Sequence, residues 1–359
     1  MTVPVTAALW FDGHASLSDR QREVLLREAG AGCMSVTHAG GDAAALGGLP
    51  GDIEKTDETG LPDCADVVFH VEAPSVSAGS RRRDAVKRLL PAAVLEWGRR
   101  ADIAVNSAKK YRAWKDFDGW GKPLPRENAV SHGVFDTLGV DAAKLIPARV
   151  LDVPGFRIDR YLELREKGIS FVSDNCWGGL MYNTLGMEIR SPFINMFIRR
   201  EHFDRLLKDL KGYLREPLVP LRLRQGQLSS TVYPIAALGD VEIHLNHVFT
   251  PAQLSEYARQ WYRRADRFLF DRVMVQTNFE TPERWEENGK AFAALSLPKI
   301  AFVPFPVEAE NVVYLECVEA FKDGIAECSR ALAKNALPSP VPYDFLDTYL
   351  GLKLSPPRE

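Results

Sequence analysis

Apolar residues recur along this chain at two different spacings. In residues 241–246 they alternate with polar residues, the period of a half-buried strand, whereas residues 203–210 carry them at helical spacing. We expect helices over residues 19–30, 81–115, 156–167, 202–214, 251–268 and 282–295. We expect strands over residues 64–72, 169–172, 194–198, 241–246, 270–276 and 299–303. Strands that alternate with helices indicate an α/β fold of layered, largely parallel sheets flanked by helices, and we expect two α/β subdomains.

The chain of 359 residues is long enough for about two domains. We expect an N-terminal α/β region over residues 1–150, a second α/β domain over residues 151–336, and a proline-rich C-terminal tail over residues 337–359. Hydrophobic residues make up 46% and charged residues 26%, as in ordinary soluble globular proteins. The net charge of −3 does not favour a nucleic-acid partner.

The first residues lack a basic leader, and no stretch of about 18 uncharged apolar residues indicates a transmembrane helix. We therefore expect a cytoplasmic protein, whose basic run Arg81–Arg83 leaves peripheral contact with a membrane open. The five cysteines include no CxxC pair, so neither a zinc ribbon nor a redox dithiol is indicated. We expect no metal and no cofactor.

Residues 169–179 (ISFVSDNCWGG) predict a strand, a tight turn and the start of a helix. In open α/β sheets, ligands bind beyond the carboxyl ends of the strands. Gly178 and Gly179 allow a sharp turn or close approach to a ligand. Free amides at the start of the helix would favour an anion such as a phosphate. This turn is therefore the first candidate site.

Four side chains of this turn carry candidate chemistry. Asp174 and Asn175 offer an acceptor and an amide to hydroxyl groups, and Asp174 is a candidate general base. Cys176 at a helix start has the setting of a nucleophilic thiolate, and Trp177 could stack on a base or a sugar. The alternative is structural, because Asp and Asn are ordinary capping residues and Cys is often simply buried.

Several motifs follow one another in a fixed order between residues 165 and 306. They are Asn175-Cys176-Trp177-Gly178-Gly179, Leu185-Gly186, Ser191-Pro192 with Asn195, Tyr233-Pro234, Leu238-Gly239-Asp240, and His244 with His247. Their order and spacing resemble domain-of-unknown-function family 1919, a bacterial family often associated with exopolysaccharide or capsule biosynthesis. Asp174 stands where that family commonly has Asn. The resemblance implies an α/β fold and a glycan-related context, and it implies no established reaction.

His244 and His247 are the main candidates beyond the turn. Three residues apart on a strand, they would point to opposite faces and would not bind one metal jointly. His244 shares a face with Glu242, which could form a polar pocket wall. The expected catalytic residues are Asp174, Cys176 and His244, and the expected substrate-binding residues are Asn175, Trp177, Gly178, Gly179, Tyr182, Asn195, Glu242 and His247. We interpret Tyr233-Pro234 as a turn.

Three functions remain open, in this order. The first is a glycosyltransferase-like enzyme of surface-polysaccharide synthesis that acts on a nucleotide-sugar or another phosphate-bearing donor, although the chain lacks a DxD metal triplet. The second is a cysteine-dependent acyl transferase or hydrolase with Cys176 as nucleophile and His244 or His247 as base, which predicts a thiol–imidazole contact. The third is a non-catalytic subunit that binds a glycan or a nucleotide. Serine hydrolase, zincin and P-loop motifs are absent.

Overall fold

The computed structural model describes residues 5–11, 16–32, 34–39, 65–71, 111–126, 145–152, 156–225 and 232–314. Outside these residues lie most of the helix expected over residues 81–115, the Arg81–Arg83 run, the tail over residues 337–359, and Cys33, Cys64, Cys317 and Cys328. Within the described part of the chain, no helix is long and apolar enough to cross a membrane.

The first sheet, sheet A, is parallel throughout and has the strand order β2-β1-β3-β4. Its strands are β1 (Val5–Phe11), β2 (Met34–Ala39), β3 (Val67–Val71) and β4 (Leu145–Pro147). Helix α1 (Asp19–Gly30) joins β1 to β2 and begins at the expected residue. The Ser18 side chain accepts from the Gln21 amide, and the Gln21 side chain accepts from the Ser18 amide.

The second sheet, sheet B, is also parallel and has the strand order β11-β10-β9-β5. Its strands are β5 (Ser170–Ser173), β9 (Val273–Asn278), β10 (Lys299–Val303) and β11 (Val312–Tyr314). Helix α7 (Trp177–Leu185) follows β5, and α11 (Pro282–Ala293) joins β9 to β10. Two parallel sheets with helices beside them confirm the expected α/β fold. About 100 residues separate β5 from its neighbour β9.

The third sheet, sheet C, lies within this long insert and is antiparallel, with the order β6-β7-β8. Its strands are β6 (Leu218–Gln225), β7 (Val232–Leu238) and β8 (Val241–His244). The interpretation of Tyr233-Pro234 as a turn is wrong, because both residues lie within the fully buried β7. Proline has no amide to donate, yet the Pro234 carbonyl accepts from the Leu245 amide at 3.0 Å. Burial of the whole strand outweighs the local turn preference.

The remaining helical segments are η1 (Ala148–Asp152, a 3₁₀ helix), α6 (Ile158–Lys167), α8 (Arg200–Lys208), α9 (Leu210–Tyr213) and α10 (Pro251–Asp266). The single helix expected over residues 202–214 is divided at Asp209. The Asp209 side chain accepts from the Gly212 amide at 2.9 Å and so caps α9. Residues 194–198 form no strand but one isolated bridge, between Phe197 and His244.

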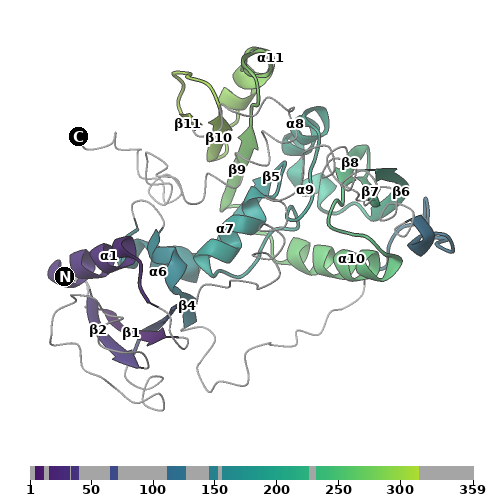
Figure 1. Ribbon diagram of the computed structural model, residues 1–359. Coiled ribbons are helices and arrows are strands. Elements are labelled where there is room, and N and C mark those ends of the chain that lie inside the picture. The colour runs from purple at the N-terminus through teal and green to yellow at the C-terminus, as the bar shows by residue number, and fades with distance from the viewer. Residues whose placement is uncertain are drawn as a thin grey trace, which may run out of the picture.

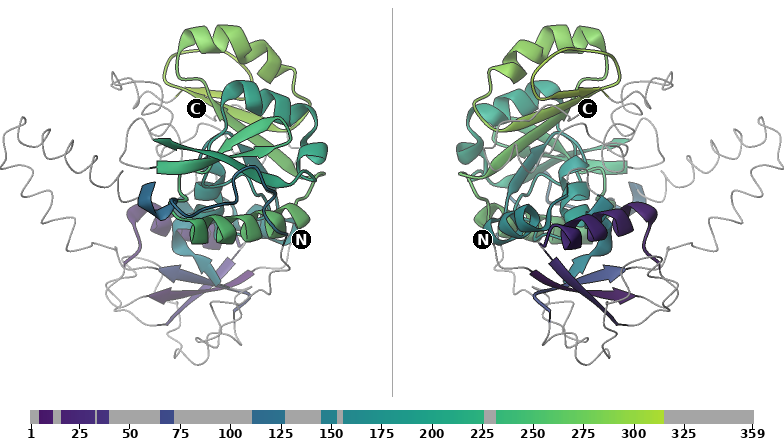
Figure 2. Two further views of the ribbon diagram at one scale, coloured as in Figure 1. Left: turned by 90° about the vertical axis from the view of Figure 1, so that its right-hand side faces the viewer. Right: turned by 90° about the vertical axis from the view of Figure 1, so that its left-hand side faces the viewer.

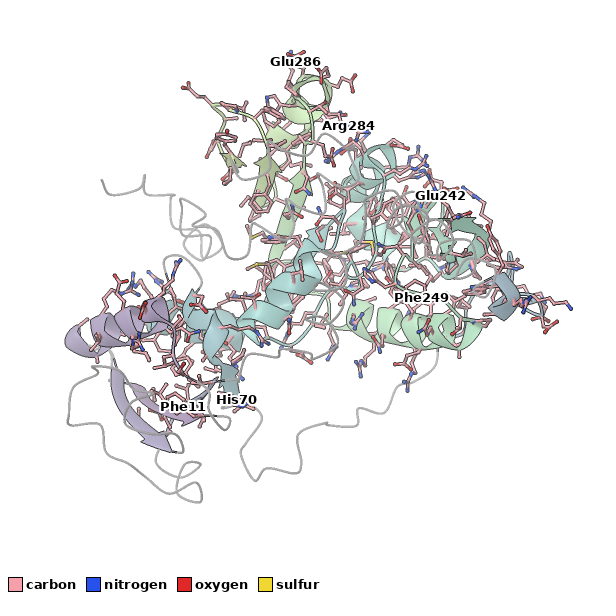
Figure 3. All side chains as sticks on the ribbon, in the orientation of Figure 1. Phe11, His70, Glu242, Phe249, Arg284 and Glu286 are labelled. Atoms are coloured by element: carbon pink, nitrogen blue, oxygen red, sulfur yellow. The ribbon has the colours of Figure 1, made fainter. Side chains whose placement is uncertain are left out.

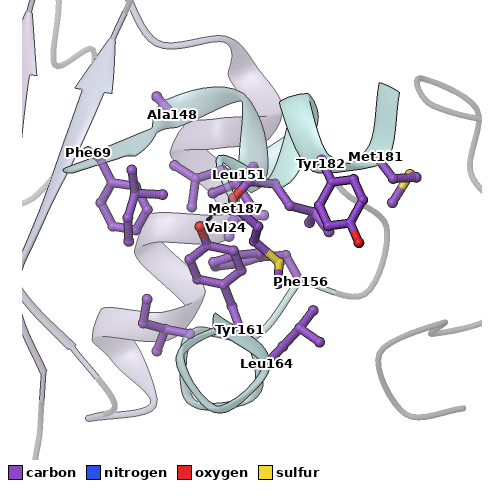
Figure 4. Close-up of a cluster of buried hydrophobic side chains, with 14 of the residues drawn as sticks. Val24, Phe69, Ala148, Leu151, Phe156, Tyr161, Leu164, Met181, Tyr182 and Met187 are labelled. Carbon is purple, nitrogen blue, oxygen red and sulfur yellow. Dashed lines mark hydrogen bonds between the residues drawn. The ribbon is translucent and has the colours of Figure 1, made fainter. Parts of the chain in front are cut away.

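Two large clusters of buried side chains hold the described elements together. The first runs from sheet A and α1 across α6 and α7 to one face of sheet B, and Figure 4 shows Val24, Phe69 and Tyr161 within it. The second joins the other face of sheet B to sheet C, α8 and α10. Helix α7 therefore lies between sheet A and the other two sheets (Figures 1 and 2). The carboxyl ends of β5 and β9 meet at one edge of sheet B.

Candidate functional site

The turn between β5 and α7 is held by its own side chains. The Ser173 hydroxyl accepts from the Gly178 amide at 3.2 Å and donates to the Asn175 carbonyl at 2.9 Å. The Asn175 side-chain oxygen accepts from the Trp177 amide at 2.8 Å, and Asn175 is buried. The first two amides of α7, which we expected to be free for an anion, therefore already have partners.

Gly178 and Gly179 permit close packing within the protein. A Cβ at Gly178 would lie 3.1 Å from the Ser173 hydroxyl and 3.2 Å from the Phe171 Cβ. A Cβ at Gly179 would lie 3.3 Å from the Asn195 side-chain oxygen. Both contacts are tight, so the glycines let the first turn of α7 lie directly against β5 and against the loop that contains Asn195.

Trp177 and Tyr182 point into the first core cluster. The Trp177 ring is 3% exposed and lies 5.3 Å from the Phe171 ring and 5.9 Å from the Phe302 ring, so it is not available to stack on a ligand. The Tyr182 hydroxyl donates to the Ile169 carbonyl at 2.7 Å, and burial raises its pKa. These contacts support a packing role for both residues.

Asn195 remains at the surface beside the start of α7. Its φ of 54° lies in the left-handed region, which Asn adopts more readily than most residues. The side chain is exposed, and its oxygen lies close to Gly179. A carboxamide is therefore presented to solvent next to Gly179, in the first turn of the helix.

Cys176 directly precedes α7, and its thiol contacts an imidazole. The distance from Cys176 Sγ to His247 Nε2 is 3.5 Å. Cys176 is half-buried, and His247 lies on an exposed turn after β8. Partial removal from water lowers the pKa of His247 from its usual 6.5. At neutral pH a neutral imidazole, which can accept a proton, therefore lies beside a thiol at the surface.

His244 lies in a different environment from His247. It is fully buried, its ring stacks on Phe197 at 4.1 Å, and its Nδ1 lies 3.4 Å from the Tyr233 hydroxyl. Burial, together with nearby arginines, lowers the pKa of His244 to about 3. The structure thus brings Cys176 together with His247, whereas His244 packs within sheet C. Glu242 lies two residues earlier on the same strand and pairs with Arg222 at 2.8 Å.

Asp174 forms a buried ion pair. One carboxylate oxygen lies 3.1 Å from an Arg200 guanidinium nitrogen and also accepts from the Thr277 hydroxyl, while the other accepts from the Asn175 amide group at 2.8 Å. The Asp174 and Arg200 side chains are 11% and 15% exposed. Burial raises the pKa of Asp174, and the charge of Arg200 opposes that rise. Asp174 therefore fastens the turn to β9 and α8.

A hollow of about 460 Å³ lies beyond the carboxyl end of β9, between α8 and α11, and we call it the α8–α11 hollow. Arg200 lies at its inner side, donates to the Asn278 carbonyl at 2.9 Å and lies 4.7 Å from the Phe279 ring centre. Four basic and four acidic side chains line the hollow. Glu280 and Arg284 lie on the α11 side of the hollow and approach each other at 3.6 Å.

The sequence analysis missed these lining residues. They come from α8 and from the segment after β9, which lie far apart in the chain and become neighbours only in the folded protein. One signal was present. The strand expected to end at residue 276 continues to Asn278, and the extra residues place Glu280 directly beyond the carboxyl edge, where ligands bind in such sheets.

This chain is similar to an uncharacterized protein of Haemophilus influenzae. The two sequences are 29% identical over 122 residues, which cover 33% of this chain and 55% of that protein. The match therefore spans about half the length of the relative.

A family model, described as "Domain of unknown function (DUF1919)", matches residues 149–337. The matched segment contains β5, α7, sheet C and α8 to α11, and so includes both the thiol–imidazole contact and the α8–α11 hollow. This match agrees with the family resemblance of the sequence motifs. Because the matched segment is more than half of the chain, the protein belongs to the DUF1919 family.

Proposed function

We propose that this protein is a cysteine-dependent acyl transferase or hydrolase, with Cys176 as the nucleophile and His247 as the general base. The observation that carries the proposal is the 3.5 Å contact between the thiol and the imidazole. A thiol beside a base is the arrangement that activates a cysteine for attack on an acyl carbonyl. The catalytic histidine is therefore His247 and not the buried His244.

The reaction proceeds in two halves. In the first, His247 Nε2 takes the thiol proton while Cys176 Sγ attacks the carbonyl carbon of the donor. The new S–C bond forms, the bond to the leaving group breaks, and the imidazolium returns its proton to that group. In the second half, His247 takes a proton from water or an acceptor hydroxyl, whose oxygen attacks the thioester carbon. Cys176 then leaves and recovers the proton.

Asn195 is the candidate for stabilising the oxyanion formed in each half. Its exposed carboxamide lies beside Gly179 in the first turn of α7, three residues after Cys176. A fixed N–H donor there would favour the negative oxygen of the tetrahedral intermediate.

The first of the three functions, a transferase for a phosphate-bearing donor, has less support. The amides expected to bind its anion already donate hydrogen bonds to the side chains of Ser173 and Asn175. Its expected stacking platform, Trp177, is buried, and its expected base, Asp174, is paired with Arg200. The surface-polysaccharide context stays a prediction from the family resemblance.

The test uses p-nitrophenyl acetate as the acyl donor and follows acetylation of the full chain by mass spectrometry. We expect one acetyl group on the peptide that contains Cys176, and none there in Cys176→Ser. The peptides of the other four cysteines serve as internal controls. His247→Gln should slow acetylation by roughly 100-fold or more, the usual contribution of a general base.

The pH profile gives a second measurement. Because the pKa of His247 is lowered, its imidazole remains an acceptor below pH 6.5, so the acid limb of the acetylation rate should lie below that value. His202→Gln is the matched control, since the His202 ring accepts from the Glu242 amide and should not affect the rate. Acetylation that is unchanged in His247→Gln, or that spreads over all five cysteines, would contradict the proposal and favour a non-catalytic binding protein.

A further inference from the structure

The α8–α11 hollow lies at the carboxyl end of β9, whose neighbour β5 leads into Cys176. Its inner cation, Arg200, pairs with Asp174, which stands two residues before the thiol. Strands β5 and β9 are neighbours in register, so the hollow and the thiol lie beyond the same edge of sheet B. Figure 3 shows Arg284 on the side of α11 that faces α8, and Glu286 on the other side.

The charges that line the hollow are balanced and incompletely paired. Glu280 is 10% exposed, and its nearest approach to Arg284 is 3.6 Å. Arg200 approaches Asp204 at 3.7 Å. The separation of Glu280 and Arg284 exceeds ordinary hydrogen-bond lengths of about 2.7–3.2 Å, so this pair leaves hydrogen-bonding capacity for a ligand. Burial and the charge of Asp174 raise the pKa of Glu280.

This balance restricts the charge of the ligand. A phosphate near Arg200 and Arg284 would also meet the carboxylates of Glu280 and Asp204. A simple cation would meet the arginines. A neutral molecule with neighbouring hydroxyl groups fits both, because each hydroxyl can donate to a carboxylate and accept from a guanidinium. The volume of about 460 Å³ lies within the range of about 300–1,000 Å³ for small-molecule sites.

We propose that the α8–α11 hollow binds a neutral sugar, with Glu280 and Arg284 contacting its hydroxyl groups, and that this sugar is the acceptor of the acyl group carried by Cys176. The acceptor role rests on the acyl-transfer function proposed above, whereas sugar binding does not. In the transfer step one sugar hydroxyl loses its proton to His247 and attacks the thioester carbon. An ester forms, the S–C bond breaks, and the thiol of Cys176 is restored.

Binding is tested first, without an acyl donor. Saturation-transfer NMR on the full chain uses methyl glucoside, methyl galactoside, methyl mannoside and N-acetylglucosamine as probes, with methyl phosphate and alanine as charged comparisons. At least one sugar should bind. Glu280→Gln and Arg284→Gln should each weaken that binding about tenfold, as expected for loss of one charge-assisted hydrogen bond. Glu286→Gln is the matched control on the opposite side of α11 and should bind normally.

Acceptor use is tested next, by adding p-nitrophenyl acetate and the sugar that binds. The expected product is the acetylated sugar, formed by the wild type and lost in Cys176→Ser. Sugar binding that is absent, or equal in Glu280→Gln and wild type, overturns the proposal, as does tighter binding of methyl phosphate or alanine at the hollow. A sugar that binds as expected while Cys176 is never acetylated overturns the acceptor role together with the acyl-transfer function, and leaves the sugar site standing.

Discussion

The two ends of α7 are held in different ways. Before its first residue, polar groups from Asp174 to Cys176 reach β9, α8 and the His247 turn. At its other end, the Leu185 carbonyl accepts from the Tyr161 hydroxyl at 2.6 Å, and Gly186 in a left-handed conformation packs against Pro147 of sheet A. Hydrogen bonds are present at both ends, whereas an ion pair contributes at the first and a close steric fit at the second. Both ends carry motifs of the family, so a shared motif does not by itself indicate chemistry.

Arg200→Gln should give the largest effect, at the end held by charge. The variant leaves Asp174 buried without its cation, close to Glu280 and Asp204. We expect the free energy of unfolding to fall by about 3–5 kcal/mol, measured by urea titration at pH 7. Without Arg200, the pKa values of the Asp174, Glu280 and Asp204 carboxyls rise further in the folded state. Protonation then favours the folded state, so the loss of stability relative to the wild type should become smaller as pH falls.

The double variant Arg200→Gln with Asp174→Asn separates charge from packing. It removes the uncompensated carboxylate, so part of the lost stability should return. A double variant as unstable as the sum of the two single variants would show that the ion pair is not what holds this end of α7.

Gly186→Ala tests the end held by steric fit. A Cβ at Gly186 would lie 2.2 Å from the Pro147 ring, and its φ of 59° disfavours a side chain. We expect a loss of about 2–4 kcal/mol in the free energy of unfolding, from strain and overpacking together. Alkylation of Cys176 in the folded protein should be unchanged, because the altered contact lies at the opposite end of the helix.

Gly30→Ala is the matched control for this variant. Gly30 ends α1, and a Cβ there would meet nothing within 4 Å. The substitution should be neutral or raise the free energy of unfolding by up to about 1 kcal/mol. If Gly30→Ala destabilised the protein as much as Gly186→Ala, the loss at Gly186 could not be attributed to its contact with Pro147.

His244→Phe extends the comparison to the two histidines and should have the smallest effect at neutral pH. His244 stays neutral down to a pKa of about 3, whereas a histidine in the unfolded chain binds a proton below about 6.5. The wild type therefore loses stability as pH falls through this window, by roughly 2 kcal/mol at pH 5 from this residue alone. Melting temperatures at pH 7 and pH 5 should differ less in the variant. Parallel shifts in both proteins would contradict this reading of His244.

Local signals in the sequence predicted much of the fold. The Ser18 cap located α1, and the apolar run from Lys299 to Val303 gave β10 with its observed bounds. Features that depend on distant parts of the chain were missed. Pro234 concealed β7, whose strand pairing depends on complete burial between β6 and β8.

The candidate site was also predicted only where local signals sufficed. Cys176 followed from the strand–turn–helix pattern, and a thiol–imidazole contact was one of its expected consequences. The choice between the two histidines depended on where β8 ends, which only the bridge from His244 to Phe197 settles. The stacking role expected of Trp177 ignored Phe302, a neighbour that is 125 positions further along the chain.

The long insert between β5 and β9 also affects the order in which contacts form during folding. Pairing these two strands closes a loop of about 100 residues, and such non-local contacts slow folding. Cys176 and His247 are 71 positions apart, so during synthesis the thiol leaves the ribosome well before the imidazole that contacts it. The contact between the Cys176 thiol and the His247 imidazole therefore forms late, once sheet C has folded against sheet B.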